Sequence, residues 1–141
     1  MYNILIVSHG DIAKGYLNTA EMIMGEVENV MAIGIQPGEG TADYGDKVFK
    51  VANELYTKDG LLVLADLYGG TPCNICISRI LPYFEKVQII AGFNLPILLE
   101  ALGSRNNSLE ESINTLLDIG NNGIVDVNAI IKNKRIDDED E

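Results

Sequence analysis

The sequence predicts an α/β fold of three layers, in which a mainly parallel, doubly wound sheet of four strands has helices on both faces. Short apolar runs alternate along the chain with segments whose apolar residues recur at helical spacing. The runs are apolar at nearly every position, as expected for strands buried on both faces. Each run is joined to the next through a helical segment, which is the connection that parallel strands need. A length of 141 residues favours a single domain.

The first half of the chain predicts two strand–helix units. Residues 2–8 form the first strand, and a helix over residues 11–24 ends at Gly25. Residues 30–35 form the second strand. After a turn-rich loop, Thr41 is expected to cap a helix that runs to about residue 56. The inward faces follow from the spacing and comprise Ile12, Tyr16, Ala20 and Ile23 in the first helix and Tyr44, Val48, Val51, Ala52 and Leu55 in the second.

The second half continues the alternation. Residues 61–65 are the most apolar strand and are expected at the centre of the sheet. Thr71 as N-cap and Pro72 as the first helical residue predict a helix to about residue 81. A strand over 87–91 and a short helix over 94–103 follow. A capping box at 108 then opens a helix that ends near 120. The last predicted element is a strand over 124–131, whose direction in the sheet is left open.

Composition limits the partners and the location of the protein. The net charge of −11 disfavours binding to nucleic acid or to anionic lipid. Residues 137–141 are all acidic, so we expect a single domain over residues 1–132 and a disordered acidic tail over 133–141. No stretch approaches the roughly 20 apolar residues of a membrane helix, and no secretory signal is evident, so a cytoplasmic location is expected.

His9 is the only histidine in the chain and stands at the exit of the first predicted strand. Asp66 stands at the exit of the third. If these strands are neighbours, both side chains face the crevice where open α/β sheets bind ligands. A carboxylate that accepts a hydrogen bond from one ring nitrogen fixes the tautomer and stabilises positive charge on the ring. The sequence therefore predicts His9 as a nucleophile oriented by Asp66.

The loops around this pair suit an anion. Helices begin near Asp11 and at Thr71, and helix starts present free N–H groups and partial positive charge. Gly10 and Gly70 permit close approach of the backbone, and the Thr71 hydroxyl can add a donor. The sequence thus predicts phosphoryl transfer through a phosphohistidine. The sequence contains no Walker-type loop, so a nucleotide is not the obvious phosphoryl donor. Because the chain has a single histidine, a multi-histidine metal site is excluded, and no metal or cofactor is expected.

Two motifs make this hypothesis more specific. Residues 4–10 (ILIVSHG) and residues 66–74 (DLYGGTPCN) together resemble the mannose-family IIA component of the bacterial phosphoenolpyruvate-dependent sugar phosphotransferase system. Residues 19–26 (TAEMIMGE) and 90–96 (IAGFNLP) add to the resemblance, which covers about residues 2–125.

The resemblance implies a phosphoryl relay. The histidine phosphocarrier protein would donate to His9, which would pass the group to a separate IIB component that alone connects it to the membrane transporter. Asp66 takes the orienting role, and Thr71 matches the Ser/Thr position beside the phosphate. The family also implies a homodimer in which residues 124–131 form a strand exchanged between subunits. The sequence does not identify the sugar.

Other interpretations stay open at this stage. A related subunit serves dihydroxyacetone kinase, although the GGTPxN stretch at 69–74 favours the transporter branch. Cys73 and Cys76 form a C-x-x-C at a helix start, as in thioredoxin-like redox proteins. A ligand-binding regulator without turnover is a third class. Asp66 as a plain turn residue and Thr71 as a plain N-cap are the structural alternatives.

Overall fold

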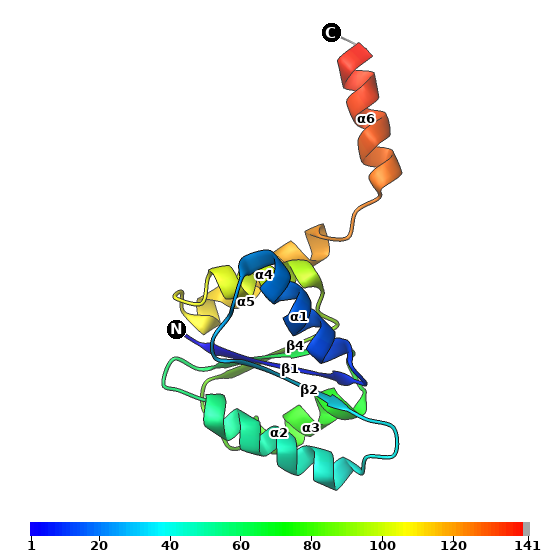
Figure 1. Cartoon of the computed structure of the whole chain (residues 1–141). Coiled ribbons are helices and arrows are strands. Elements are labelled where there is room, and N and C mark those ends of the chain that lie inside the picture. The colour runs from blue at the N-terminus through cyan, green and yellow to red at the C-terminus, as the bar shows by residue number, and fades with distance from the viewer. Residues whose placement is uncertain (140–141) are drawn as a thin grey trace.

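A parallel sheet of four strands forms the middle of the computed structural model, which describes residues 1–139 (Figure 1). The strands are β1 (Asn3–His9), β2 (Val30–Ile35), β3 (Leu61–Ala65) and β4 (Val87–Ala91). Their order across the sheet is β2-β1-β3-β4, and each neighbouring pair is parallel. The α/β class, the four parallel strands and the central place of residues 61–65 are therefore confirmed.

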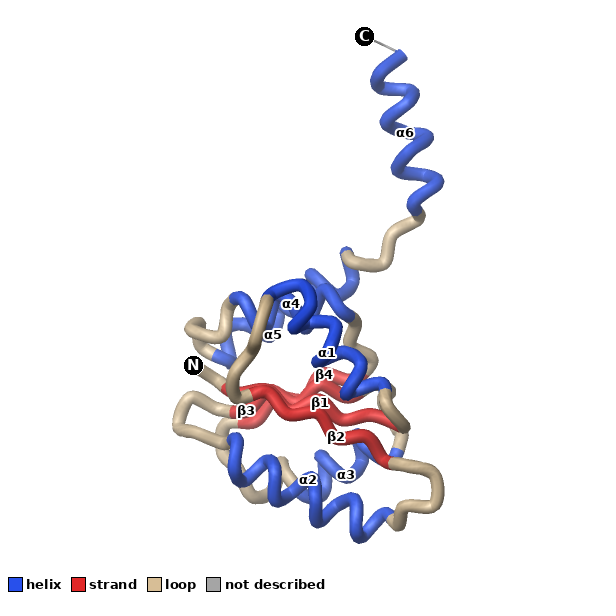
Figure 2. The backbone as a smooth tube through the Cα atoms, in the orientation of Figure 1, coloured by secondary structure: helices blue, strands red, loops and turns tan. Residues whose placement is uncertain are grey.

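Helices cover both faces of this sheet (Figure 2). One layer contains α1 (Ile12–Met24), α4 (Leu95–Gly103) and α5 (Leu109–Asn122), and the other contains α2 (Thr41–Leu55) and α3 (Thr71–Arg79). Alternate residues of each strand enter separate cores. Ile4 and Ile6 of β1 pack on the side of α1, whereas Leu5 and Val7 pack on the side of α2.

The strand order brings the carboxyl ends of β1 and β3 side by side at one edge of the sheet. These two strands are neighbours, with Val7 in register with Ala65. The helices that follow them, α1 and α3, lie in opposite layers, so the two exit loops diverge (Figure 2). This is the topological switch point at which open α/β sheets bind ligands. His9 and Asp66 both lie there, as the sequence predicted.

The predicted inward face of α1 is wrong in part. Ile12 and Ile23 are 50% and 58% exposed, whereas Ala13 and Ala20 are fully buried. The helix therefore packs through its small residues, which lets its backbone approach the sheet closely, and the larger apolar side chains turn outward. For α2 the prediction holds: Tyr44, Val48, Ala52 and Leu55 are buried and Val51 is partly buried.

The helix starts also differ from the prediction by one residue. Thr41 and Thr71 are the first residues of α2 and α3, and Gly40 and Gly70 occupy the N-cap positions. Ser108 is the N-cap residue of α5, but its side chain makes no capping hydrogen bond. Because Gly70 takes the cap position before α3, the Thr71 hydroxyl is not needed to close that helix.

Residues 124–131 do not form the predicted strand. Residues 124–126 are irregular, and α6 (Val127–Glu139) projects away from the domain (Figure 1). A strand needs a neighbour for its backbone groups, whereas a helix satisfies them internally. Asp126 accepts a hydrogen bond from the Ala129 amide at 3.1 Å and so caps this helix. Residues 133–139 of the expected tail belong to α6, and residues 140–141 lie outside the described residues.

Among residues 1–139, no helix is both long enough and apolar enough to span a lipid bilayer.

Candidate active site

His9 and Asp66 meet at the exit of the two central strands. The ring Nδ1 of His9 and Oδ2 of Asp66 are 2.9 Å apart. The backbone N–H of His9 donates to the same Oδ2, also at 2.9 Å. The Asp66 amide in turn donates to the Val7 carbonyl at 3.2 Å, which ties the β3 exit to β1. One carboxylate oxygen thus holds both the backbone and the ring of His9.

This contact determines which ring nitrogen is free to react. An ionised carboxylate only accepts hydrogen bonds, so Nδ1 carries the hydrogen and Nε2 keeps a free lone pair. The His9 side chain is 48% exposed, while that of Asp66 is only 10% exposed. The arrangement therefore combines a sheltered orienting carboxylate with a nucleophilic nitrogen on a ring that a large partner can reach.

The loop between β3 and α3 lies against the reactive edge of the ring. A Cβ added to Gly70 would be 2.6 Å from Cε1 and 3.2 Å from Nε2 of His9, so only glycine fits beside the ring in this position. Gly69 has a φ of +86°, and its carbonyl accepts a hydrogen bond from the Asn74 side chain at 3.3 Å. The N-terminus of α3 therefore begins next to Nε2.

Thr71 and Gly10 have different surroundings. Among residues 1–139, the Thr71 hydroxyl has no hydrogen-bond partner, so it is available at the start of α3. The Gly10 amide, in contrast, donates to the Ile35 carbonyl at 2.7 Å, and Gly10 has a φ of +53°. Gly10 therefore shapes the turn after β1, and its amide is not free to bind a ligand.

Sequence reasoning missed Ser8, which is fully buried at the end of β1. It occupies the place of an apolar residue in the series Ile4, Ile6, Ser8 that faces the α1 layer. A polar residue at a core position is the signal that was available in the sequence.

The two cysteines do not form a reactive pair. Cys73 and Cys76 are free thiols with 1% and 0% exposure. Burial, together with the neighbouring Cys73, raises the pKa of the Cys76 thiol to about 12. Since the thiolate is the reactive form, these surroundings argue against thioredoxin-like chemistry and favour a packing role.

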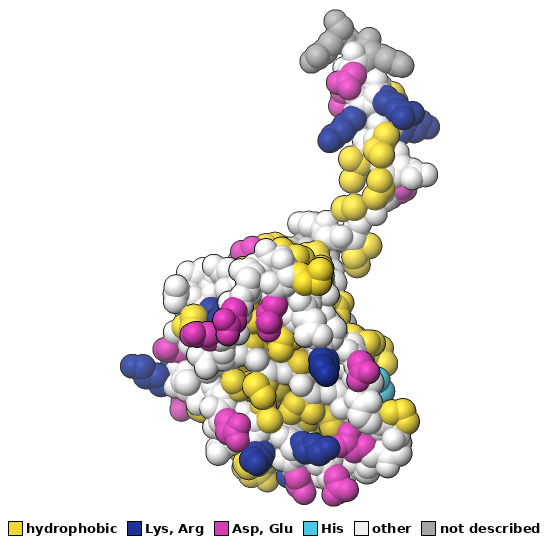
Figure 3. Space-filling model, in the orientation of Figure 1, with side chains coloured by type: hydrophobic (Ala, Val, Ile, Leu, Met, Phe, Trp, Pro, Cys, Tyr) yellow, Lys and Arg dark blue, Asp and Glu magenta, His cyan; other side chains and the backbone are white. Residues whose placement is uncertain are grey.

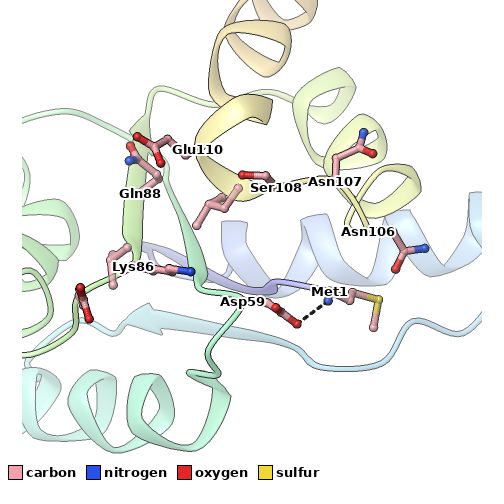
Figure 4. Close-up of a pocket in the computed structure, with 11 residues that line it drawn as sticks. Met1, Asp59, Lys86, Gln88, Asn106, Asn107, Ser108 and Glu110 are labelled. Carbon is pink, nitrogen blue, oxygen red and sulfur yellow. Dashed lines mark hydrogen bonds and ion pairs between the residues drawn. The ribbon is translucent and has the colours of Figure 1, made fainter.

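A cavity of about 360 Å³ opens at the opposite end of the sheet (Figure 4). Its lining combines charges of both signs, including Asp59, Lys86 and Glu110, and the N-terminal amine bonds Asp59 at 2.7 Å. The described residues around it include no histidine or cysteine. Across residues 1–139, no three His, Cys, Asp or Glu side chains gather as a metal site would require.

The orienting role predicted for Asp66 has a measurable consequence. Asp66→Asn is expected to keep the fold and to slow phosphoryl uptake by about tenfold, because a neutral acceptor loses roughly 1.4 kcal/mol relative to a charge-assisted one. Rapid-quench measurement of phosphorylated protein gives the rate. The matched control is Asp46→Asn, because Asp46 pairs with Arg79 on the outside of α2. Equal rates in the wild type and in Asp66→Asn would contradict the role.

The chain matches a family model over most of its length. The model is described as "PTS system fructose IIA component", and residues 3–117 match it. One curated relative, the PTS system mannose-specific EIIAB component of Escherichia coli K12, is 38% identical over 123 residues. That match covers 86% of this chain but only 38% of the relative, so the chain spans well under half of that protein.

Relatives of similar size show the same likeness. The PTS system fructose-specific EIIA component of Bacillus subtilis is 33% identical over 117 residues, covering 82% of this chain and 80% of the relative. The crystal structure of phosphotransferase system component EIIA from Streptococcus agalactiae has a TM-score of 0.83 at 30% identity, covering 92% of this chain and 99% of that one. With the matched family model, these relatives establish that the chain belongs to the mannose-family EIIA components of the phosphotransferase system.

Proposed function

We propose that His9 accepts a phosphoryl group from the histidine phosphocarrier protein and passes it to a separate IIB component during sugar uptake in the cytoplasm. The observation that carries this proposal is the 2.9 Å contact between Nδ1 of His9 and Asp66, which leaves Nε2 as the free nitrogen of a half-exposed ring. Membership of a phosphotransferase family supports the same chemistry. The sugar is not specified, since the names of the relatives include mannose, fructose and sorbose.

In the proposed transfer, the Nε2 lone pair attacks phosphorus while the bond to the donor nitrogen breaks and its electron pair returns to the donor. Positive charge that develops on the ring is stabilised by Asp66 through Nδ1–H. Free amides at the start of α3 and the Thr71 hydroxyl stabilise the phosphoryl oxygens. The reverse sequence, with the IIB component as acceptor, releases the group and restores the ring.

The direct test is phosphorylation of the purified protein. The wild type is incubated with phosphoenolpyruvate, the first enzyme of the system and the phosphocarrier. Intact-mass measurement should then show the gain of one phosphoryl group, which is lost on acid treatment because phosphohistidine is acid-labile. Subsequent addition of a mannose-family IIB component should remove it. If the wild type gains no mass, the proposed function is wrong.

We also propose that the C-terminal arm, residues 124–139, pairs with a second copy of the chain. Every described side chain of α6 is exposed, and an isolated helix of 13 residues is marginal in water. Hydrophobic side chains lie along the arm (Figure 3) and comprise Ile124, Val125, Val127, Ile130, Ile131 and Ile136. A second copy would cover these side chains, and an edge strand of its sheet would give residues 124–131 the partner that a strand needs.

Truncation tests the role of the arm. A chain that ends at Gly123 is expected to be monomeric by light scattering, because it lacks the exposed apolar residues that the dimer would bury. A chain that ends at Arg135 keeps Ile124 to Ile131 and should remain dimeric, which makes it the matched control. A full-length chain that stays monomeric at high concentration would contradict the proposal.

A further inference from the structure

The turn that carries His9 is held by the buried hydroxyl of Ser8. The Ser8 Oγ accepts a hydrogen bond from the Ala13 amide at 2.8 Å and donates to the Gly10 carbonyl at 3.2 Å. Asp11, the N-cap residue of α1, makes no side-chain cap, so the hydroxyl of Ser8 takes over part of that role from inside the domain. The bond from Ala13 ties the end of β1 to the first turn of α1, and the bond to Gly10 closes the turn that follows His9.

Strand β2 fixes the other side of the same turn. The Ile35 carbonyl accepts the Gly10 amide at 2.7 Å. Gly34 packs so tightly on the turn that an added Cβ would overlap the Gly10 carbonyl oxygen and would be 3.3 Å from the Ser8 Oγ. The peptide groups of Gly10 are therefore held by β2 on one side and by Ser8 on the other.

The position of the ring depends on this backbone. Within the described residues, the only hydrogen-bond partner of the His9 ring and of its amide is Oδ2 of Asp66. The exposed ring has few neighbours to hold it, so a shift of the peptide on either side of His9 moves Nε2 relative to the start of α3. Misplacement of a reacting atom by about 1 Å is enough to lower a rate by about 100-fold.

We propose that Ser8 is a positioning residue, whose hydroxyl sets the orientation of the His9 ring toward Asp66 and the incoming phosphoryl group. The inference rests on the proposed role of His9 and extends it to a residue that does not touch the reacting atoms. Because Ser8 acts on orientation and not on docking, it should affect kcat and leave the KM for the phosphocarrier nearly unchanged.

The test compares Ser8→Ala with Ser8→Thr, which restores a hydroxyl, and with Ser112→Ala as a matched control. Ser112 is also a buried serine, but its Oγ donates to the Ser108 carbonyl in α5, away from the crevice. We expect kcat to fall by about 10- to 100-fold in Ser8→Ala, to recover largely in Ser8→Thr, and to stay unchanged in Ser112→Ala. Ring ¹⁵N chemical shifts should show a loss of the single Nδ1–H tautomer in Ser8→Ala alone.

Two measurements separate this inference from the proposed function. Because the Ala13 amide donates to the Ser8 hydroxyl, hydrogen exchange of the wild type should find this amide protected. The measurement needs no phosphorylated protein, and it remains possible if Ser8→Ala does not fold. An unprotected Ala13 amide, or a folded Ser8→Ala with wild-type kcat and ring shifts, would overturn the inference. A wild type that takes up no phosphoryl group would instead refute the proposed function, while the exchange and ¹⁵N data still decide the role of Ser8.

Discussion

Replacement of His9 by glutamine is expected to abolish phosphoryl uptake completely. The chain contains no other histidine that could take over, and the glutamine amide has no nucleophilic nitrogen lone pair. The ring is 48% exposed, so little packing is lost and the free energy of unfolding should change by less than about 1 kcal/mol. Intact-mass measurement after incubation with the phosphocarrier system gives the result, and urea unfolding gives the stability.

The glutamine variant also distinguishes two causes of lost uptake, which are removal of the reactive ring nitrogen and a general loss of structure. Its circular dichroism and its size in solution should match those of the wild type, because no core contact depends on the ring. Acid-labile phosphate on the variant would mean that another side chain is the acceptor, and the assignment of His9 would then be withdrawn.

Gly70→Val is expected to lower phosphoryl uptake by at least about 100-fold, since displacement of reacting groups by an ångström has an effect of that size. The added Cβ would be 2.6 Å from Cε1 of His9, so the ring must rotate away and lose its contact with Asp66. Backbone strain is not the cause, because Gly70 has a φ of −86°. The rate follows from rapid-quench measurement, and ring ¹⁵N shifts report the displacement.

Gly103→Val is the matched control for this variant. Gly103 is exposed at the end of α4, and a Cβ there would meet no atom within 4 Å. Valine has a somewhat higher helix propensity than glycine, so the substitution should not destabilise α4 and should leave the transfer rate unchanged. A Gly70→Val protein that is folded and transfers at the wild-type rate would show that the α3 loop does not lie against the phosphoryl group.

The sequence was sufficient to predict the sheet and the meeting of His9 with Asp66, because both depend on local patterns. Continuous apolar runs identify buried strands, and residues at the exits of neighbouring parallel strands must share one edge of the sheet. His9 and Asp66 followed from this rule, and the structure places them in direct contact. Their functional roles and that of the α3 loop stay predictions until the variants are measured.

What the sequence could not predict depends on packing between segments far apart in the chain. Ala20 is buried as the spacing predicted, but Ile12 and Ile23 are exposed, and Ala13, which the spacing did not select, takes a buried position against the sheet. Gly34 of β2 packs against the turn that follows His9. This contact could be predicted only with knowledge of which strand lies beside β1. Residues 124–131 have strand-like composition, yet a strand forms only with a partner, and in this single chain residues 124–126 are irregular and residues 127–131 are helical.

If His9 carries the phosphoryl group as proposed, its contact with Asp66 through Nδ1 has a kinetic consequence. With one ring nitrogen engaged, donor and acceptor proteins must approach the same remaining atom, so they cannot be bound productively at the same time. The exchange should therefore follow a ping-pong scheme, with parallel double-reciprocal plots when the two partner concentrations are varied. Excess of either partner should inhibit the other competitively.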